Sequence, residues 1–419
     1  MMRRLSVTLT LALFTASIGV AAEPVPAAPA AASASSGAAK AKVILAVFPE
    51  AIQLDTARDY QSFVATTQRA DGITQDVTAT AKWNIADPNI AKIEANRVVP
   101  VADGDTELIC DLGSTQLRVP VKVSRSSESL PISFEKDIVP IMTRSGCNTG
   151  SCHGAARGKD GFMISLFGYD PAGDYTRITR QIGMRRVNLA VPEDSLFLTK
   201  SVGRVPHSGG KLFGGDSVYY AMMLEWLQAG APKDETPPPS VDKLEIYPAQ
   251  SVIEGEGSTQ RFISVAHYSD GTTRDVTNLS AFMTNNETSA AVDNDGNVTA
   301  GARGEAFIMA RFETKTEGRQ VLVLPKDLKY EVPEVTGNYI DQLVGKKLNQ
   351  LRILPSDLCT DEEFLRRVTI DITGMLPTED EYRQFVNDVA ADKRSALIER
   401  LLSRKEFSEI WAMKFAQLL

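Results

Sequence analysis

A repeated segment constrains the fold of this chain more than any other feature. Residues 71–78 read Asp-Gly-Ile-Thr-Gln-Asp-Val-Thr, and residues 270–277 read Asp-Gly-Thr-Thr-Arg-Asp-Val-Thr. An aromatic residue follows at the same offset in both copies, Trp83 in the first and Phe282 in the second. Short runs of alternating apolar and polar residues, separated by Asp-Gly and Asn-Gly turns, surround each copy, which is typical of half-buried antiparallel strands. The repeat therefore predicts two all-β sandwiches, at about 42–124 and 240–326.

The second copy resembles the bacterial Ig-like group 2 domain. The motif D-G-T-x-x-D-V-T, the following aromatic residue and a late G-x-V-x-A segment all match within 270–300. The first copy departs at 96–100, which lacks the glycine of that late segment. We interpret the repeated aspartates as residues that cap turns, in preference to metal ligands, because Asp side chains commonly bond the backbone two residues on.

Length and charge set outer limits on function. The 419 residues suit two to four domains. There are 53 acidic and 45 basic residues, for a net charge of −8. Tight nucleic-acid binding needs a basic surface that neutralises phosphates, so the sequence predicts no nucleic-acid partner.

The N-terminus has the organisation of a secretory signal peptide. Arg3 and Arg4 precede the apolar run 7–20, and small residues end at Ala22. We expect residues 1–22 to be removed near Ala22, which leaves an Ala/Pro/Ser-rich linker at 23–41. The apolar run is shorter than the roughly 20 residues of a membrane span, so an uncleaved anchor is the weaker alternative. The mature chain is expected in the periplasm or at the cell surface.

The residues with the most specific chemistry lie between the two copies. Cys147, Cys152 and His153 account for three of only seven cysteines and histidines in the chain. Two thiols followed directly by an imidazole suit covalent haem attachment, in which the thiols bond the vinyl groups and the imidazole binds iron. The usual motif has two residues between the cysteines, and this one has four. The loop must therefore bulge, and Gly150 is expected to make that bulge sterically inexpensive.

Two other interpretations of these residues remain open. Cys147 and Cys152 could form a small disulfide loop in an exported protein, which would leave His153 without a role. A zinc site would need a fourth ligand that this spacing does not supply. The other two cysteines fall in different predicted modules, and Cys110 is interpreted as a buried small apolar residue.

Residues 131–236 resemble the cytochrome c domain of large exported planctomycete proteins. Three segments carry the resemblance: an opening helix at 134–141, the attachment residues 152–154, and a closing helix at 224–232 that reads Leu-Glu-Trp-Leu-Gln-Ala-Gly-Ala-Pro. The resemblance implies an all-α domain with one covalent haem c, with Cys147 and Cys152 as attachment residues and His153 as the proximal iron ligand.

His207 is the predicted distal iron ligand. It lies in a Pro-His-Ser-Gly-Gly loop before the closing helix, and the resemblance implies that the distal ligand lies in this stretch. The alternative is an exposed loop histidine. Other candidates are His267, which belongs to the second sandwich, and the core-like helix stripe of Met222 and Met223. Two further methionines of the central stretch, Met163 and Met184, also stay open.

The C-terminal segment is predicted to be helical. Apolar residues recur at helical spacing from Ile340, and two Thr-x-x-Glu capping boxes begin at Thr360 and Thr378. Residues 335–419 resemble the N-terminal part of the domain of unknown function 1549 family, and the chain ends where that family usually continues, which suggests a truncated segment. We expect no catalytic site here.

Two function classes follow from these patterns. In the first, the chain is an exported c-type haem protein that transfers electrons to an unidentified redox protein, with Ig-like spacers and an association with the cell surface or envelope. In the second, it is a structural or adhesive surface protein whose central segment carries a disulfide and no haem. Whether it is an enzyme stays open, and a carrier is favoured over a catalyst because no residue clearly supplies a distal acid or base.

Overall fold

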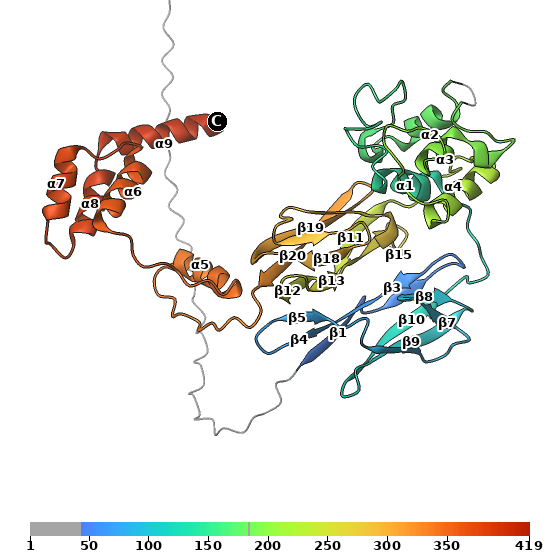
Figure 1. Cartoon of the computed structure of the whole chain (residues 1–419), viewed down its shortest axis with the longest axis horizontal. Coiled ribbons are helices and arrows are strands. Elements are labelled where there is room, and N and C mark those ends of the chain that lie inside the picture. Colours follow the sequence, from blue (N-terminus) through green and yellow to red (C-terminus); the bar gives the residue numbers. More distant parts are fainter. Residues whose placement is uncertain (1–42, 183–184) are drawn as a thin grey trace, which may run out of the picture. The chain divides into compact units, whose positions relative to one another are not determined.

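The computed structural model describes residues 43–182 and 185–419. The predicted signal peptide and the linker at 23–41 lie outside these residues, as does Met184. The described part contains sandwich-like β-sheets in the N-terminal and middle portions and helices towards the C-terminus (Figure 1).

The first copy of the repeat forms three small sheets, with strand orders β1-β4-β5, β2-β10-β9-β6 and β3-β8-β7. All pairings are antiparallel except that of β2 with β10, which is parallel. The strands are β1 (Ile44–Phe48), β2 (Ile52–Leu54), β3 (Gln61–Ser62), β4 (Val64–Gln68), β5 (Thr74–Asp76), β6 (Lys82–Ile85), β7 (Ala91–Glu94), β8 (Arg97–Pro100), β9 (Gly104–Asp111) and β10 (Gln116–Val123).

The second copy repeats this arrangement strand for strand. Its sheets have the orders β11-β14-β15, β12-β20-β19-β16 and β13-β18-β17, again with one parallel pair, β12 with β20. The strands are β11 (Val241–Tyr247), β12 (Gln250–Glu254), β13 (Thr259–Arg261), β14 (Ile263–Tyr268), β15 (Thr273–Asp275), β16 (Ala281–Thr284), β17 (Ala290–Val292), β18 (Asn297–Ala300), β19 (Gly304–Phe312) and β20 (Lys315–Leu324).

Alternating side chains build the core of each copy. In β10, Val119, Val121 and Val123 are buried while the residues between them are exposed. This period of two places one face of the strand in the core. Cys110 on β9 is fully buried in the first core, as predicted.

The repeated aspartates cap turns, as predicted, and they also join the two copies. One oxygen of Asp76 accepts a hydrogen bond from the backbone N–H of Thr78, and Asp275 does the same for Thr277, both at 2.9 Å. The second oxygen of Asp275 accepts from Ser62 N–H of the first copy at 2.6 Å, and that of Asp76 accepts from Arg261 N–H of the second at 2.9 Å. Ser62 and Arg261 occupy equivalent positions of the repeat, so the contact is reciprocal.

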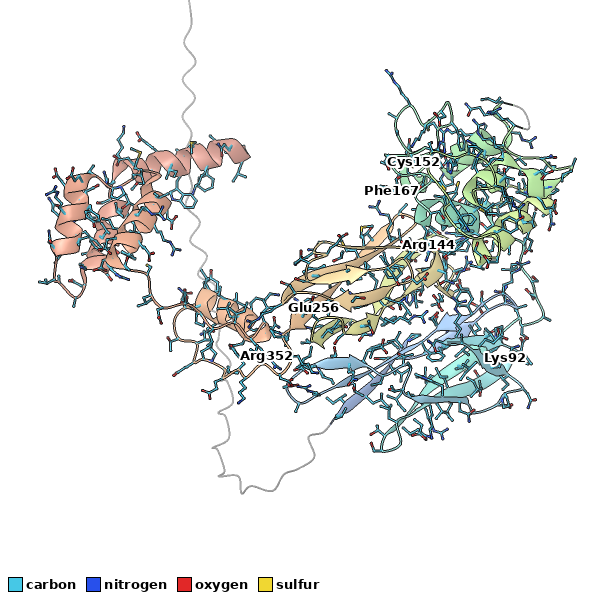
Figure 2. All side chains as sticks on the ribbon, viewed as in Figure 1. Lys92, Arg144, Cys152, Phe167, Glu256 and Arg352 are labelled. Atoms are coloured by element: carbon cyan, nitrogen blue, oxygen red, sulfur yellow. The ribbon has the colours of Figure 1, made fainter. Side chains whose placement is uncertain are left out.

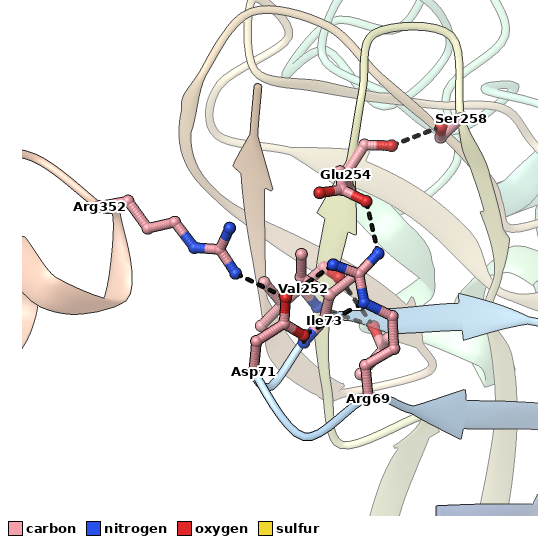
Figure 3. A network of polar contacts seen from close by, with 8 residues as sticks. Arg69, Asp71, Ile73, Val252, Glu254, Ser258 and Arg352 are labelled. Atoms are coloured by element: carbon pink, nitrogen blue, oxygen red, sulfur yellow. Dashed lines mark hydrogen bonds and ion pairs between the residues drawn. The ribbon is translucent and has the colours of Figure 1, made fainter. Parts of the chain in front are cut away.

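A surface network also links segments far apart in the sequence (Figure 3). Asp71 of the first copy accepts hydrogen bonds from Arg69 at 2.6 Å and from Arg352 at 3.1 Å. Arg69 also donates to Glu254 of the second copy at 2.7 Å. The side chains of Arg69 and Asp71 are about half exposed, whereas those of Glu254 and Arg352 are 18% and 13% exposed. The Arg69–Asp71 pair at the surface therefore contributes little to stability.

The central segment between the copies consists of short helices joined by long loops, with an isolated bridge between Lys159 and Phe162. Its helices are η1 (Phe134–Ile138), α1 (Val139–Arg144), η2 (Leu166–Gly168), α2 (Pro171–Thr179), η3 (Pro192–Asp194), α3 (Leu196–Ser201) and α4 (Val218–Gln228).

The opening and closing helices of this segment pack together. The ring of Phe134 lies 5.5 Å from that of Trp226 on α4 and 5.3 Å from that of Tyr175 on α2. Trp226 is fully buried, and its indole N–H donates to the carbonyl of Pro232 at 2.9 Å. A buried ring with its polar atom satisfied fixes the end of α4 against the start of the segment.

The C-terminal portion is helical, as predicted. Both predicted capping boxes are present, with reciprocal side-chain and backbone bonds between Thr360 and Glu363 and between Thr378 and Glu381. Leu365, Phe385, Leu397 and Leu401 form a small core between the three helices α6, α7 and α8. The helices are α5 (Tyr339–Gln350), α6 (Asp361–Thr373), α7 (Glu379–Asn387), α8 (Lys393–Leu402) and α9 (Lys405–Leu418).

Candidate functional site

The loop that carries the two cysteines follows α1 directly. Cys147 N–H donates to the carbonyl of Met142 at 2.9 Å, which extends the helix end into the loop, and His153 N–H donates to the carbonyl of Cys147 at 3.0 Å. The second bond closes the loop, so Cys147 and His153 lie close together despite the long spacing. Figure 2 labels Cys152, on the same loop.

The geometry of this loop requires glycine at Gly146, whose φ is +76°, and at Gly154, but not at Gly150. A Cβ on Gly154 would lie 2.0 Å from the carbonyl oxygen of Asn148, which no side chain tolerates. A Cβ on Gly150 would meet no atom within 4 Å, and its φ is not positive. The loop therefore folds back at its end, where the backbone approaches itself, and not at its middle.

His153 and His207 are held in the same way by backbone carbonyls. Nδ1 of His153 is 3.0 Å from the carbonyl oxygen of Phe162, and Nδ1 of His207 is 3.0 Å from that of Gly210. A carbonyl only accepts, so in the neutral form of each ring Nδ1 carries the proton and Nε2 has the free lone pair. This tautomer is the one in which Nε2 binds a metal, with the second hydrogen bond fixing the ring.

The two imidazole rings face a common region although 53 residues separate them in the sequence. Their centroids are 6.3 Å apart and their planes differ by 7°. Two imidazoles bound through nitrogen on opposite sides of one metal would have centroids about 6 Å apart, since each bond is about 2 Å and each nitrogen lies roughly 1.1 Å from its ring centroid. The observed separation is close to this value.

Burial sets the protonation of the site. Partial burial, assisted by the neighbouring His207, lowers the pKa of His153, so its imidazole is neutral at pH 7 and available to a metal. Burial together with the nearby Cys152 raises the pKa of the Cys147 thiol to about 12. Cys147 is therefore a protonated thiol at neutral pH, in contrast to the activated thiolate of a catalytic cysteine.

A cavity of about 210 Å³ lies beside these residues. Its wall includes Cys147, His153 and His207 but not Cys152, which is half-buried on the loop. The rest of the wall combines apolar and basic side chains with one acidic residue, Asp160. The apolar residues are Ile164, Ile182, Leu196, Leu212, Phe162 and Phe197, and the basic residues are Lys159, Arg185, Arg186 and Lys200.

Both thiols are free in the structure. No group of three or more His, Cys, Asp and Glu residues positioned to hold a metal ion occurs among residues 43–182 and 185–419. His153, His207 and the thiol of Cys147 are the residues at the cavity wall that could hold a haem, and Cys152 is the one predicted residue that is not at that wall.

The other predicted candidates for the distal position lie elsewhere. Nε2 of His267, on β14 of the second copy, is 2.7 Å from a carboxylate oxygen of Glu245. Met223 is buried in the helix core, as its spacing with Met222 indicates. Met163 is half-buried and outside the cavity wall.

Sequence reasoning missed two side chains of this site. Phe162 packs its ring 4.7 Å from that of His153 and also supplies the carbonyl that holds it. Arg186 places its guanidinium 4.1 Å from the centre of the Phe162 ring. Neither belongs to a motif, and only the fold of the intervening loop brings them to His153.

Comparison with solved structures finds low similarity over much of the chain. The S-layer protein rSbsC(31-844) is 9% identical, with a TM-score of 0.17 over 67% of this chain and 27% of that one. Domains 5-6 of the S-layer protein SbsC are 10% identical, with a TM-score of 0.26 over 67% and 99%. Extracellular domains 3-5 of Drosophila OTK are 7% identical, with a TM-score of 0.13 over 68% and 62%. The chain thus spans about a quarter of the first of these proteins.

No curated protein matches the sequence. In the described part of the chain, none of the helices is long and apolar enough to cross a membrane. Residues 339–419, which span α5 to α9, match the family described as PSCyt2, protein of unknown function (DUF1549), as the capping boxes and the surrounding residues predicted. It is to this family that the C-terminal segment of the chain is similar.

Proposed function

We propose that the chain is an exported c-type haem protein that transfers electrons. The observation that carries the proposal is the histidine pair: two rings from distant loops, nearly parallel, with centroids 6.3 Å apart and both Nδ1 atoms bonded to carbonyls. Both features are those expected of two imidazoles that hold one metal.

Each residue of the site has a defined task in this proposal. Were a haem bound, His153 and His207 would hold its iron through Nε2, with the carbonyls of Phe162 and Gly210 keeping the two rings in place. Cys147 and Cys152 would supply the thiols for covalent attachment to its vinyl groups, an addition that needs no oxidant. Bound haem supplies a one-electron couple.

The remaining parts of the chain have supporting roles in the proposal. The two Ig-like copies act as spacers, and the C-terminal helices dock to another envelope component. The proposed location is the periplasm or the cell surface, after cleavage near Ala22. With two protein ligands on the iron, no position is open to substrate, which favours a carrier over a peroxidase.

The first experiment is a spectrum of the full chain produced with a haem-attachment system. We expect a Soret band, a c-type pyridine haemochrome and the mass of one haem on the polypeptide. Absence of all three, together with a mass that shows a Cys147–Cys152 disulfide, would end the electron-transfer proposal and support the haem-free adhesive alternative.

Single variants separate the roles. Cys147→Ser should retain one thioether, at Cys152, and Cys152→Ser should impair both attachment and the placement of His153. His207→Ala should abolish the low-spin bis-imidazole spectrum. His267→Ala is the matched control, because this histidine pairs with Glu245 in the second copy and its loss should leave the spectrum unchanged. A methionine-type charge-transfer band in the native protein would exclude His207.

A further inference from the structure

Arg186 is a buried cation on the wall of the cavity that holds the two histidines. Arg186 is 7% exposed. Its guanidinium donates to the carbonyls of Arg177 at 3.2 Å and Gln181 at 2.9 Å, and it lies over the ring of Phe162. These contacts fix its direction but supply only partial negative charge.

No acidic side chain neutralises Arg186 within the part of the chain that the structure describes. Burial lowers its pKa, the neighbouring Arg185 acts in the same direction, and no carboxylate opposes them. Arg274, a half-buried arginine on β15, illustrates the usual arrangement, because it forms an ion pair with the buried Asp137 at 2.6 Å. A buried charge without a counter-charge is costly, so an anionic group on the cavity side would stabilise Arg186.

The charge around the cavity has the same sign. Lys159, Arg185, Arg186 and Lys200 line it, and Asp160 is its one acidic lining residue among those described. The ligand of this cavity is therefore expected to carry negative groups as well as a face that packs on Phe162 and Phe197.

We propose that Arg186 binds a carboxylate of the molecule that His153 and His207 hold, which in the case of haem is a propionate. This inference rests on the proposed haem function. A guanidinium bonds a carboxylate through two parallel N–H groups, and it keeps its charge at all physiological pH values. Arg186 is thus a positioning residue that would fix the orientation of the haem about its axis. It would also raise the reduction potential of the haem by offsetting the negative charge of the carboxylate.

The test measures the midpoint potential of the haem-loaded full chain by spectroelectrochemistry. Arg186→Gln removes the charge, and we expect it to favour the oxidised state about tenfold, a fall of 59 mV for a one-electron couple. Arg186→Lys keeps the charge and should keep most of the potential. Arg180→Gln is the matched control: Arg180 is exposed at the end of α2 and outside the cavity wall, so its loss should leave the potential unchanged.

Pyridine haemochrome content and thermal unfolding are measured for every variant. These measurements distinguish an effect on haem attachment or stability from an effect on the midpoint potential. An unchanged potential in a haem-loaded Arg186→Gln protein would overturn the carboxylate assignment while leaving the haem proposal intact. Wild-type protein without haemochrome would instead defeat the proposed function. If Arg186→Gln does not acquire haem, Arg186→Lys becomes the deciding variant, and a normal haem content and midpoint potential in it would support the role of the charge. If neither variant acquires haem, Arg186 is needed for packing and the inference is overturned.

Discussion

Replacing Asp275 with alanine tests how the two copies of the repeat are joined. Asp275 is 2% exposed, and its two carboxylate oxygens accept hydrogen bonds from the backbone N–H groups of Ser62 and Thr277. Both donor residues are 1% exposed, so water cannot replace the lost carboxylate. The variant would leave two buried donors without partners.

The expected loss of stability follows from these two donors. A buried N–H left unsatisfied costs about 1 to 3 kcal/mol, so Asp275→Ala should cost about 2 to 6 kcal/mol. That is a large share of the roughly 5 to 15 kcal/mol that stabilises an ordinary domain. Asp76 is the equivalent residue of the first copy, but it is only half-buried and one of its backbone donors, Arg261, is also half-buried. Asp76→Ala should therefore cost less, about 1 to 3 kcal/mol.

Urea denaturation followed by circular dichroism gives the two free energies of unfolding, and hydrogen exchange at single amides locates the effect. The amides of Ser62 and Thr277 should lose protection in Asp275→Ala, although Ser62 lies in the other copy. Unchanged exchange at Ser62, or a cost equal to or below that of Asp76→Ala, would refute the argument that the buried carboxylate joins the copies.

Three further outcomes are expected. Burial would raise the pKa of Glu245, but hydrogen bonds from three neighbours outweigh it and lower that pKa to about 2, below its ordinary 4.5. Ionised Glu245 therefore stabilises the fold above pH 4.5, and this contribution is lost as the pH falls towards 2. Glu245→Gln should reduce the loss of stability on acidification by on the order of 2 kcal/mol in a stability–pH curve. Thr378→Ala removes the capping box with Glu381 and should cost about 1 kcal/mol in thermal unfolding of the C-terminal helices, and an equal effect from Thr378→Ser would argue against the cap. Asp71→Asn, in the exposed network of Figure 3, should cost less than about 1 kcal/mol at any salt concentration, and a larger loss in urea titration would show that the network is more than a surface contact.

Local patterns were sufficient for the elements of the fold. The alternation within β10 and the turn motifs of the repeat depend on neighbours in the chain, so two sandwiches could be predicted without knowledge of packing. The capping boxes at Thr360 and Thr378 are likewise contacts over three residues, and both formed as expected. Residues 339–419 also match the family that their motifs indicated.

Contacts over long distances were decided by the tertiary structure. The sequence by itself determined that Cys147, Cys152 and His153 lie on one loop, because only seven positions of the chain contain all three. It did not determine that Gly154 is the tight point of their loop, that His207 lies parallel to His153, or that Arg186 is buried on the same cavity without a counter-charge. These arrangements arise when loops without a periodic sequence pattern pack on a common core. The residues that stabilise each loop are distant in the sequence, so a local motif does not identify them.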